Sequence, residues 1–298
     1  MEDDGADTAP EIHDLSSMKG LYLLPGRRGR PVLEMQKSAV RIEGATEPAI
    51  AGTLPRVAVI AHWAPTGRLS RSVSELTSVL VNHGYEVIIS SSAEGEGDLA
   101  WPEVRPSNVT VLRRPNLGYD FGSWATALDR YPAIAAADQV LLLNDSLAGP
   151  FQPIDQLLRH FDQSGADVWG MTDTCQFGRH LQSYCLGFKR GCLTEGPLAR
   201  FWRGVRVERS RDDVIWRYEI GLSRLLHRER FSIDAAIGYR KVVSEGQNPT
   251  IIGWRRLLDA GFPFVKRQLL RQPEAAPDGS LVREEVQRRF GVNLDQWL

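Results

Sequence analysis

Five short apolar runs recur between residues 56 and 175, and helical or turn-like segments separate them. The runs are RVAVIAH, YEVIISSS, VTVLRR, DQVLLLN and DVWGMT. Short runs rich in β-branched and aliphatic residues are typical of strands buried on both faces. SELTSVLVNHG, with Ser72 and Glu75 in a capping-box pattern, and DFGSWATALDRY are helical segments between them. Strands that alternate with helices predict an α/β fold with a mostly parallel, doubly wound central sheet flanked by helices.

The pattern differs on either side of this region. Residues 1–52 are acidic and carry Gly and Pro with only brief apolar runs, so we expect an extended or disordered tail. Residues 53–175 form the predicted α/β half. Residues 176–298 form a helix-rich half of the same domain, in which HLQSYCLGF resembles a strand. Its predicted amphipathic helices are PLARFWRGV, DDVIWRYEIGLSRLLHRE, NPTIIGWRRLLDAGF and LVREEVQRRF.

The composition is that of an ordinary globular chain: 42% of the 298 residues are hydrophobic and 24% are charged. No apolar run reaches the roughly eighteen residues that a membrane span needs. The acidic start MEDDGADTAPEIHD lacks the features of a secretory signal. We therefore expect a cytoplasmic protein. Its three cysteines have no metal-ligand spacing and are expected to be reduced thiols.

The net charge of -1 conceals an asymmetry between the two halves. Residues 1–175 carry 14 basic against 23 acidic side chains, and residues 176–298 carry 22 against 14. A basic second half could face phosphates, an anionic acceptor or the anionic surface of a membrane. It could equally consist of solvated helix faces.

Polar residues follow each predicted strand, and in open parallel sheets ligands bind at the carboxyl ends of the strands. These residues are His62, Ser90 to Ser92, Arg113 to Asp120, Asn144 to Ser146, and Asp173. Asp120 lies near a helix start, where its charge would oppose a phosphate. We therefore expect it to bind a sugar or ribose hydroxyl; the alternative is that Asp120 is an N-cap after a turn at Asn116 and Gly118.

Asp145 follows the apolar run VLLLN, where an ionised carboxylate is costly unless a cation or several donors meet it. Mg²⁺ or Mn²⁺ accepts one or two carboxylates when substrate phosphates complete its shell. The run therefore indicates a metal bound to a diphosphate. The alternative is that Asp145 forms an Asx turn in the loop to Gly149.

Two features of the second half indicate side chains with a role in binding or catalysis. Alternation in HLQSYCLGF places His180, Gln182 and Tyr184 on one face, which suits a hydroxyl-rich acceptor or a structural hydrogen-bond network. Glu219 lies among apolar residues of a helix, and burial there would raise its pKa toward that of a general base. The alternative places Glu219 on a helix surface.

In order along the chain, NLGYDFGSW, LLLNDSLAGPF, DVWGMTD, HLQSYCLGF, YEIGLS and NPTIIGWRRLLDAGFPFVK resemble the rhamnan synthesis protein F family of bacterial glycosyltransferases. The resemblance covers about residues 56–271. It implies a GT-A-like fold with a nucleotide-sugar-binding half, an acceptor-binding half, and a role in building rhamnose-containing cell-surface polysaccharides. The donor site it implies comprises His62, Asn116, Gly118, Asp120, Asn144, Asp145 and Ser146. The acceptor side it implies includes His180, Gln182, Ser183 and Tyr184.

One motif departs from the GT-A pattern. Enzymes of that fold commonly carry Asp-any-Asp at this strand tip, whereas this chain has Asn144, Asp145 and Ser146. Asp145 is thus the predicted ligand of Mg²⁺ or Mn²⁺, and Lys266 or arginines are alternative partners of the leaving diphosphate.

We therefore expect an inverting transfer of a deoxysugar such as L-rhamnose to a growing or lipid-linked glycan, with Asp173 or Glu219 as the base. Peripheral contact with the inner membrane face is an expected partner interaction, and a nucleic-acid partner is not expected. The alternative function is a non-catalytic glycan-binding or scaffolding subunit. A dinucleotide-dependent enzyme is disfavoured, because AHWAPTGRLS lacks Gly-x-Gly-x-x-Gly.

Overall fold

The computed structural model describes residues 29–43, 55–95 and 97–298. Its centre is a sheet in the order β1-β4-β3-β2-β5-β9-β7-β10, and β8 pairs with β7 outside that path. The strands are β1 (Arg41–Ile42), β2 (Arg56–His62), β3 (Glu86–Ser91), β4 (Val109–Arg113), β5 (Gln139–Asn144), β7 (Val168–Thr174), β8 (His180–Leu181), β9 (Cys185–Lys189) and β10 (Ile233–Ile237).

The sheet is mixed, so the prediction of a mostly parallel sheet is wrong. β4, β3, β2 and β5 run parallel as expected, and β10 is parallel to β7. However, β9 lies antiparallel between β5 and β7, and β1 is antiparallel to β4. The cause lies in HLQSYCLGF, predicted as one strand. It forms β8 and then β9, which run in the same direction. The chain reverses after β7, so that both are antiparallel to β7 and β9 also pairs with β5.

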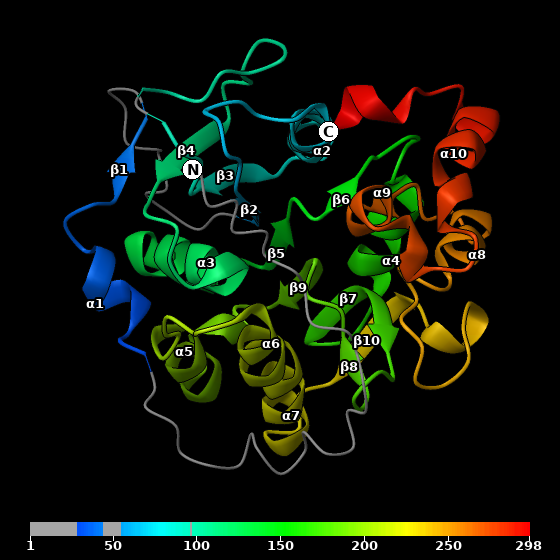
Figure 1. The fold of residues 1–298 in the computed structure, drawn as a ribbon. Helices are drawn as coiled ribbons and strands as arrows, with labels where there is room; N and C mark the ends of the chain where they lie inside the picture. Colours follow the sequence, from blue (N-terminus) through cyan, green and yellow to red (C-terminus); the bar gives the residue numbers. More distant parts are fainter. Residues whose placement is uncertain (1–28, 44–54, 96) are drawn as a thin grey trace, which may run out of the picture.

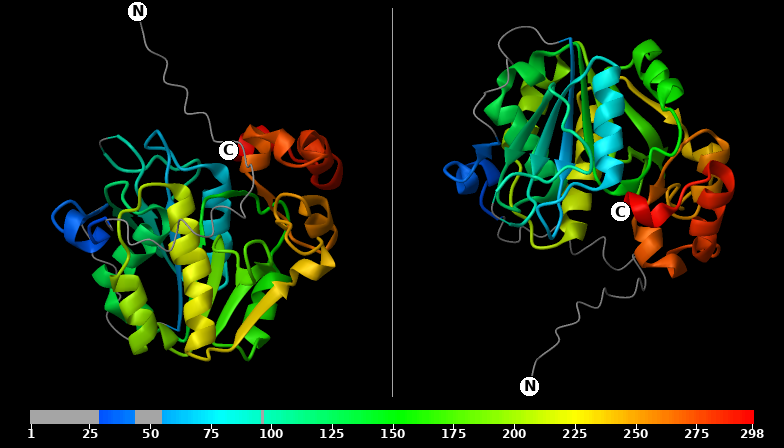
Figure 2. Two further views of the ribbon diagram at one scale, coloured as in Figure 1. Left: turned by 60° about the horizontal axis from the view of Figure 1, so that its bottom comes forward. Right: turned by 90° about the horizontal axis from the view of Figure 1, so that it is seen from above.

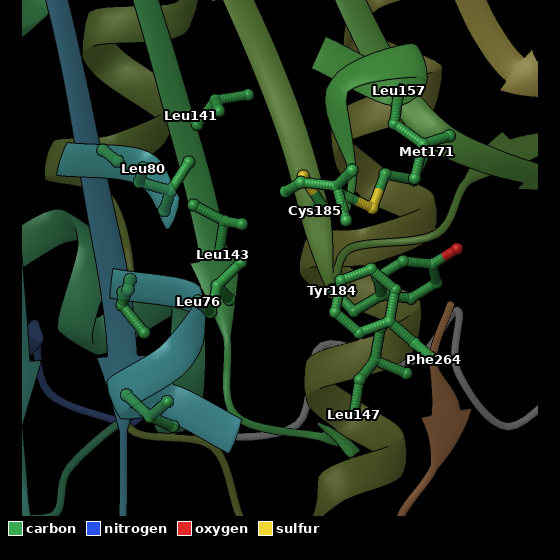
Figure 3. Close-up of a cluster of buried hydrophobic side chains, with 14 of the residues drawn as sticks. Leu76, Leu80, Leu141, Leu143, Leu147, Leu157, Met171, Tyr184, Cys185 and Phe264 are labelled. Atoms are coloured by element: carbon green, nitrogen blue, oxygen red, sulfur yellow. The ribbon is translucent and has the colours of Figure 1, made fainter. Parts of the chain in front are cut away.

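Helices cover both faces of the sheet (Figures 1 and 2). One layer contains α2 (Arg71–Asn82) and α4 (Asp155–Gln163); the other contains α3 (Tyr119–Arg130), α5 (Gly196–Arg203), α6 (Arg211–Val214) and α7 (Ile220–Arg228). Leu141 and Leu143 of β5 pack toward α2 and α4, as Figure 3 shows, whereas Leu142 belongs to the opposite cluster. Because β5 is buried on both faces, its sequence is a continuous apolar run.

A third apolar cluster lies beside the sheet, where the C-terminal segments pack. Its elements are β6 (Leu147–Ala148), β11 (Val265–Lys266), α8 (Trp254–Asp259), α9 (Gln268–Arg271) and α10 (Val282–Phe290). Short 3-10 helices occupy Pro132–Ala136, Cys192–Thr194, Tyr239–Lys241, Pro273–Ala275, Gly279–Leu281 and Leu294–Trp297. β11 pairs antiparallel with β6, and this pairing sets Lys266 opposite Leu147. Distant parts of the chain therefore meet at the end of β5.

Two further expectations are corrected. Ser72 does not cap α2, because its hydroxyl donates to the Trp297 carbonyl at 2.5 Å, and Ser70 holds the N-cap position. Part of the predicted N-terminal tail is folded: residues 29–43 contain α1 (Val32–Gln36) and β1. Val32 and Gln36, one helical turn apart, are buried against the fold. The rest of the predicted tail up to residue 52 lies outside the described residues.

Within the ranges that the structure describes, no helix combines the length and apolar character needed to cross a bilayer. All three cysteines are free thiols, as predicted.

Candidate functional site

A cavity of about 1360 Å³ opens at the carboxyl ends of β2, β3, β4 and β5. This is the edge at which the polar strand ends were predicted to meet. The cavity wall includes seven of the predicted donor-site residues: His62, Asn116, Gly118, Asp120, Asp145, Ser146 and Lys266. The second half also contributes Val207, Glu208, Arg211, Arg267, Gln268, Leu270, Arg271 and Gln272.

The tip of β5 is held by a hydrogen-bonded series of side chains. Asn144 donates from Nδ2 to the Asp120 carboxylate at 2.6 Å. Its Oδ1 accepts from the backbone N–H and the hydroxyl of Ser146, at 3.1 and 2.6 Å. Lys266 Nζ in turn donates to Ser146 Oγ at 2.9 Å. Asn144, rather than Asp145, therefore forms the Asx turn, and Asp145 is left to face the cavity.

Asp145 and Asp120 are two carboxylates in a region of low solvation. Trp63 donates its backbone N–H to Asp145 Oδ2 at 2.8 Å. Burial raises the pKa of Asp145, although this hydrogen bond and the charge of Arg267 oppose the shift. Burial, and then the charge of Asp145, raise the pKa of Asp120 to about 6 against the hydrogen bond from Asn144. Such paired carboxylates favour a bound cation.

Basic side chains stand beside these carboxylates. Burial lowers the pKa of Lys266 to about 8, even though Glu219, Asp120 and Asp145 favour its charged form. Burial also lowers the pKa of Arg267, whose Nε has no hydrogen-bond partner among the described residues. The cavity wall contains further arginines: Arg68, Arg71, Arg211, Arg271 and Arg283.

His62 is uncharged at neutral pH. Burial, followed by the charges of Arg267 and Arg113, lowers its pKa to about 4. Its Nδ1 lies 3.0 Å from Ser91 Oγ at the end of the neighbouring strand. His62 can therefore give a ligand a neutral hydrogen bond but no charge.

The predicted acceptor residues separate into two groups, because the turn between β8 and β9 breaks the expected alternation. Ser183 Oγ donates to Glu219 at 2.8 Å, and His180 Nε2 lies 3.5 Å from the same carboxylate. Gln182 and Tyr184 instead contact Thr172 Oγ1, at 2.7 and 2.6 Å. All four are buried and none lines the large cavity, so the expected single polar face is absent.

Glu219 ends a π-helical turn, Ile215–Glu219, that joins α6 to α7. Such turns are frequent at functional sites. Burial alone would raise the pKa of Glu219, but the hydrogen bond and charge of His180, the Ser183 hydroxyl and the Lys266 charge together lower it. The predicted upward shift is therefore wrong, and Glu219 is ionised at neutral pH.

Asp173 lies apart from this arrangement. Both of its oxygens are engaged: Oδ1 accepts from the Tyr239 N–H at 2.6 Å, and Oδ2 accepts from Arg179 Nε at 3.2 Å. The carboxylate is buried and does not line the cavity. Its contacts fix the loops that follow β7 and β10.

The sequence reasoning missed two aromatic residues of the cavity wall. Trp63 is 41% exposed and Tyr119 is 46% exposed, which is unusual for large aromatic side chains. Tyr119 also has a φ of 53°, in the left-handed region. Trp63 directly follows the end of β2, and this position in the sequence could have indicated that it lies at the cavity. The wall arginines of the second half had one signal, the basic excess of that half, whereas Arg68 and Arg71 of the first half had none.

Comparisons with known proteins found similar sequences and one matching family. The virulence protein VirA of Vibrio anguillarum is 29% identical over 243 residues, which cover 70% of this chain and 77% of VirA. The uncharacterized protein y4gN of Sinorhizobium fredii is 23% identical over 210 residues, or 68% of this chain and 54% of that protein. The family model for rhamnan synthesis protein F matches residues 90–295. Because this match spans more than half of the chain, the chain belongs to the rhamnan synthesis protein F family.

Proposed function

We propose that this protein is a GT-A-like glycosyltransferase that moves a deoxysugar, such as L-rhamnose, from a nucleotide-diphosphate donor to a growing cell-surface polysaccharide. The family name supports a part in polysaccharide synthesis. The observation that carries the proposal is the pairing of carboxylates and cations in one cavity: Asp120 and Asp145 stand beside Lys266 and Arg267. A nucleotide sugar presents hydroxyls and a diphosphate, which require these two kinds of partner.

Each part of the donor has a partner in this proposal. Lys266, Arg267 and Arg271 neutralise the leaving diphosphate, which gains charge as the glycosidic bond breaks. Asp120 accepts a hydrogen bond from a sugar or ribose hydroxyl. The exposed rings of Trp63 and Tyr119 supply apolar surface for the base or the sugar face.

A divalent cation fits the two carboxylates of this cavity as oxygen ligands. Asp120 and Asp145 would hold Mg²⁺ or Mn²⁺, and the substrate diphosphate would complete the oxygen shell. Among residues 29–43, 55–95 and 97–298, no group of three or more His, Cys, Asp or Glu side chains is arranged to hold a metal. When bound, the cation would add positive charge at the leaving group, alongside Lys266 and Arg267.

Glu219 is the better candidate for the base that deprotonates the acceptor hydroxyl in an inverting transfer. It is ionised, and its His180 and Ser183 contacts fix its orientation. Glu219 does not itself line the cavity, but its carboxylate interacts with the charge of Lys266, which does. Asp173 has both oxygens occupied and is retained only as the second candidate.

The test is a donor-hydrolysis assay with uridine, deoxythymidine and guanosine diphosphate sugars, with EDTA or with Mn²⁺. We expect turnover with one donor, and about a 100-fold loss in the Asp145→Asn variant. A donor at 100 times its dissociation constant should also stabilise the fold by about 2.7 kcal/mol. Binding without turnover would favour the glycan-binding or scaffolding alternative, and no binding of any donor would contradict the proposal.

The acceptor and the location are also proposals. We propose a glycan or lipid-linked glycan acceptor presented at the cytoplasmic face of the inner membrane, with the basic second half contacting that surface peripherally. Residues 176–298 carry 22 basic and 14 acidic side chains, and this net positive charge supports the orientation.

A further inference from the structure

The folded part of the N-terminal region, residues 29–43, is called the arm here. It lies outside residues 90–295, which the family model matches. Figure 1 shows its helix α1 beside α3 and α5, on the far side of the molecule from α8 and α10. Three separate contacts connect the arm to loops that line the cavity.

The first contact is with the segment that precedes α6. Val32 donates its N–H to the Val205 carbonyl at 2.9 Å, and Val207 donates to the Arg30 carbonyl at 3.0 Å. Val207 and the residue after it line the cavity. The arm also packs against the neighbouring loop, because a Cβ added to Gly118 would lie 2.6 Å from Val32 Cγ2.

The second contact passes through a buried cation. Arg114 Nε donates to Gln36 Oε1 at 3.0 Å, and the same guanidinium donates to Ser123 Oγ at 2.8 Å and to the Leu117 carbonyl. Gln36 Nε2 also donates to Thr126 Oγ1. Gln36 therefore orients the guanidinium that holds Leu117, the middle residue of the cavity-lining stretch from 116 to 118.

The third contact involves Glu43, which is buried at the end of the arm. It accepts from the Leu99 N–H at 2.9 Å and from Arg113 at 3.0 Å. Arg113 also donates to the Ala93 and Gly97 carbonyls, each at 2.9 Å. Ala93, Gly97 and Leu99 belong to the loop that follows β3. The two ends of this loop, Ser92 and Pro102, line the cavity.

We infer that the arm is a brace of the donor cavity, and that Gln36 is a positioning residue that acts through Arg114 on the loop from 115 to 118. The identity of the ligand in this inference rests on the proposed function. The mechanical role of the arm does not depend on that function. The cavity shape then depends on a segment that the family match does not include.

Hydrogen exchange on the ligand-free full chain tests the mechanical part. Gln36→Met keeps the volume of the side chain but removes the acceptor of Arg114 Nε. We expect amide exchange in residues 116–120 to become about tenfold faster, since a buried donor loses its partner. Met35→Gln is the matched control, because Met35 is 42% exposed in the same helix. Gln36→Glu retains the acceptor and should restore slow exchange.

Titration with UDP, dTDP and GDP tests the link to the ligand. For the nucleotide that wild type binds, we expect the Kd of Gln36→Met to rise about tenfold. The kcat at saturating donor should change by less than about threefold, because the charged side chains that line the cavity are unchanged in this variant. Unchanged exchange at residues 116–120, or equally faster exchange throughout the sheet, would overturn the inference. If wild type binds none of the three nucleotides, the proposed function fails, whereas the exchange result still decides whether the arm is a brace.

Discussion

At the scale of single residues, the cavity combines groups that would each be unfavourable alone. The charge of Asp145 raises the pKa of Asp120, and burial lowers the pKa of Lys266 to about 8. These buried charges are therefore expected to lower the stability of the empty protein, and under the proposed function a bound donor would complete the site. Substitutions that remove one of these charges should stabilise the empty protein and weaken its activity.

Asp120→Asn tests this relation. The pKa of Asp120 is raised to about 6, so the folded state binds this proton more tightly than the unfolded state. The stability that this group contributes is full below pH 4 and is lost as the pH rises through 6. At pH 7.5 we expect the Tm of the variant to rise by about 2 °C or more, while donor turnover falls. Asp129→Asn, an exposed carboxylate on the same helix, should change neither value.

Lys266 should set the alkaline limit of donor binding. Its pKa is lowered to about 8 in the empty site, so its positive charge is lost as the pH rises past 8. The Kd for the donor should therefore increase between pH 7 and pH 9, as measured by calorimetric titration. Lys266→Met should bind weakly at both values. A wild-type Kd that is the same at pH 7 and pH 9 would show that the charge of Lys266 does not contribute.

Glu219 and Asp173 can be separated by their kinetics. Glu219→Gln should lower kcat by about 100-fold or more and leave the Kd of the donor unchanged, as expected for a general base. Asp173→Asn should retain most of its kcat but lower the Tm, because the Tyr239 and Arg179 contacts are structural. The reverse pattern would make Asp173 the base.

At the scale of elements, the β6–β11 pair is what places Lys266 at the tip of β5. Gly149 follows β6 with a φ of 122°, and a Cβ there would lie 2.5 Å from the Pro263 carbonyl oxygen. Gly149→Ala should destabilise the fold by about 1–3 kcal/mol and weaken donor binding, measured by denaturant unfolding and titration. Gly165→Ala is the matched control, since a Cβ there meets no atom within 4 Å.

At the scale of the whole molecule, we expect the two halves to unfold as one unit, because strands of the second half complete the sheet of the first. β9 pairs with both β5 and β7, and β10 pairs with β7. Calorimetry should show a single transition whose calorimetric and van't Hoff enthalpies agree. Two resolved transitions would show that residues 53–175 and 176–298 are separate domains.

The sequence by itself determined the local elements and the composition of the site. β2, β3, β4, β5 and α3 lie where the apolar runs and the helical spacing predicted them, because burial on two faces or on one stripe is visible in the order of residues. The polar ends of parallel strands met at one edge for the same reason. Thus His62, Asp120 and Asp145 were predictable as neighbours.

Only the tertiary structure decided which distant segments complete that edge. The reversal after β7 placed β9 antiparallel between β5 and β7, and the break between β8 and β9 separated Gln182 and Tyr184 from His180 and Ser183. The burial of Val32 and Gln36 packed part of a predicted tail against the fold, where Gln36 accepts a hydrogen bond from Arg114. Such contacts depend on matching surfaces far apart in the chain, and the periodicity of one segment carries no information about its partner.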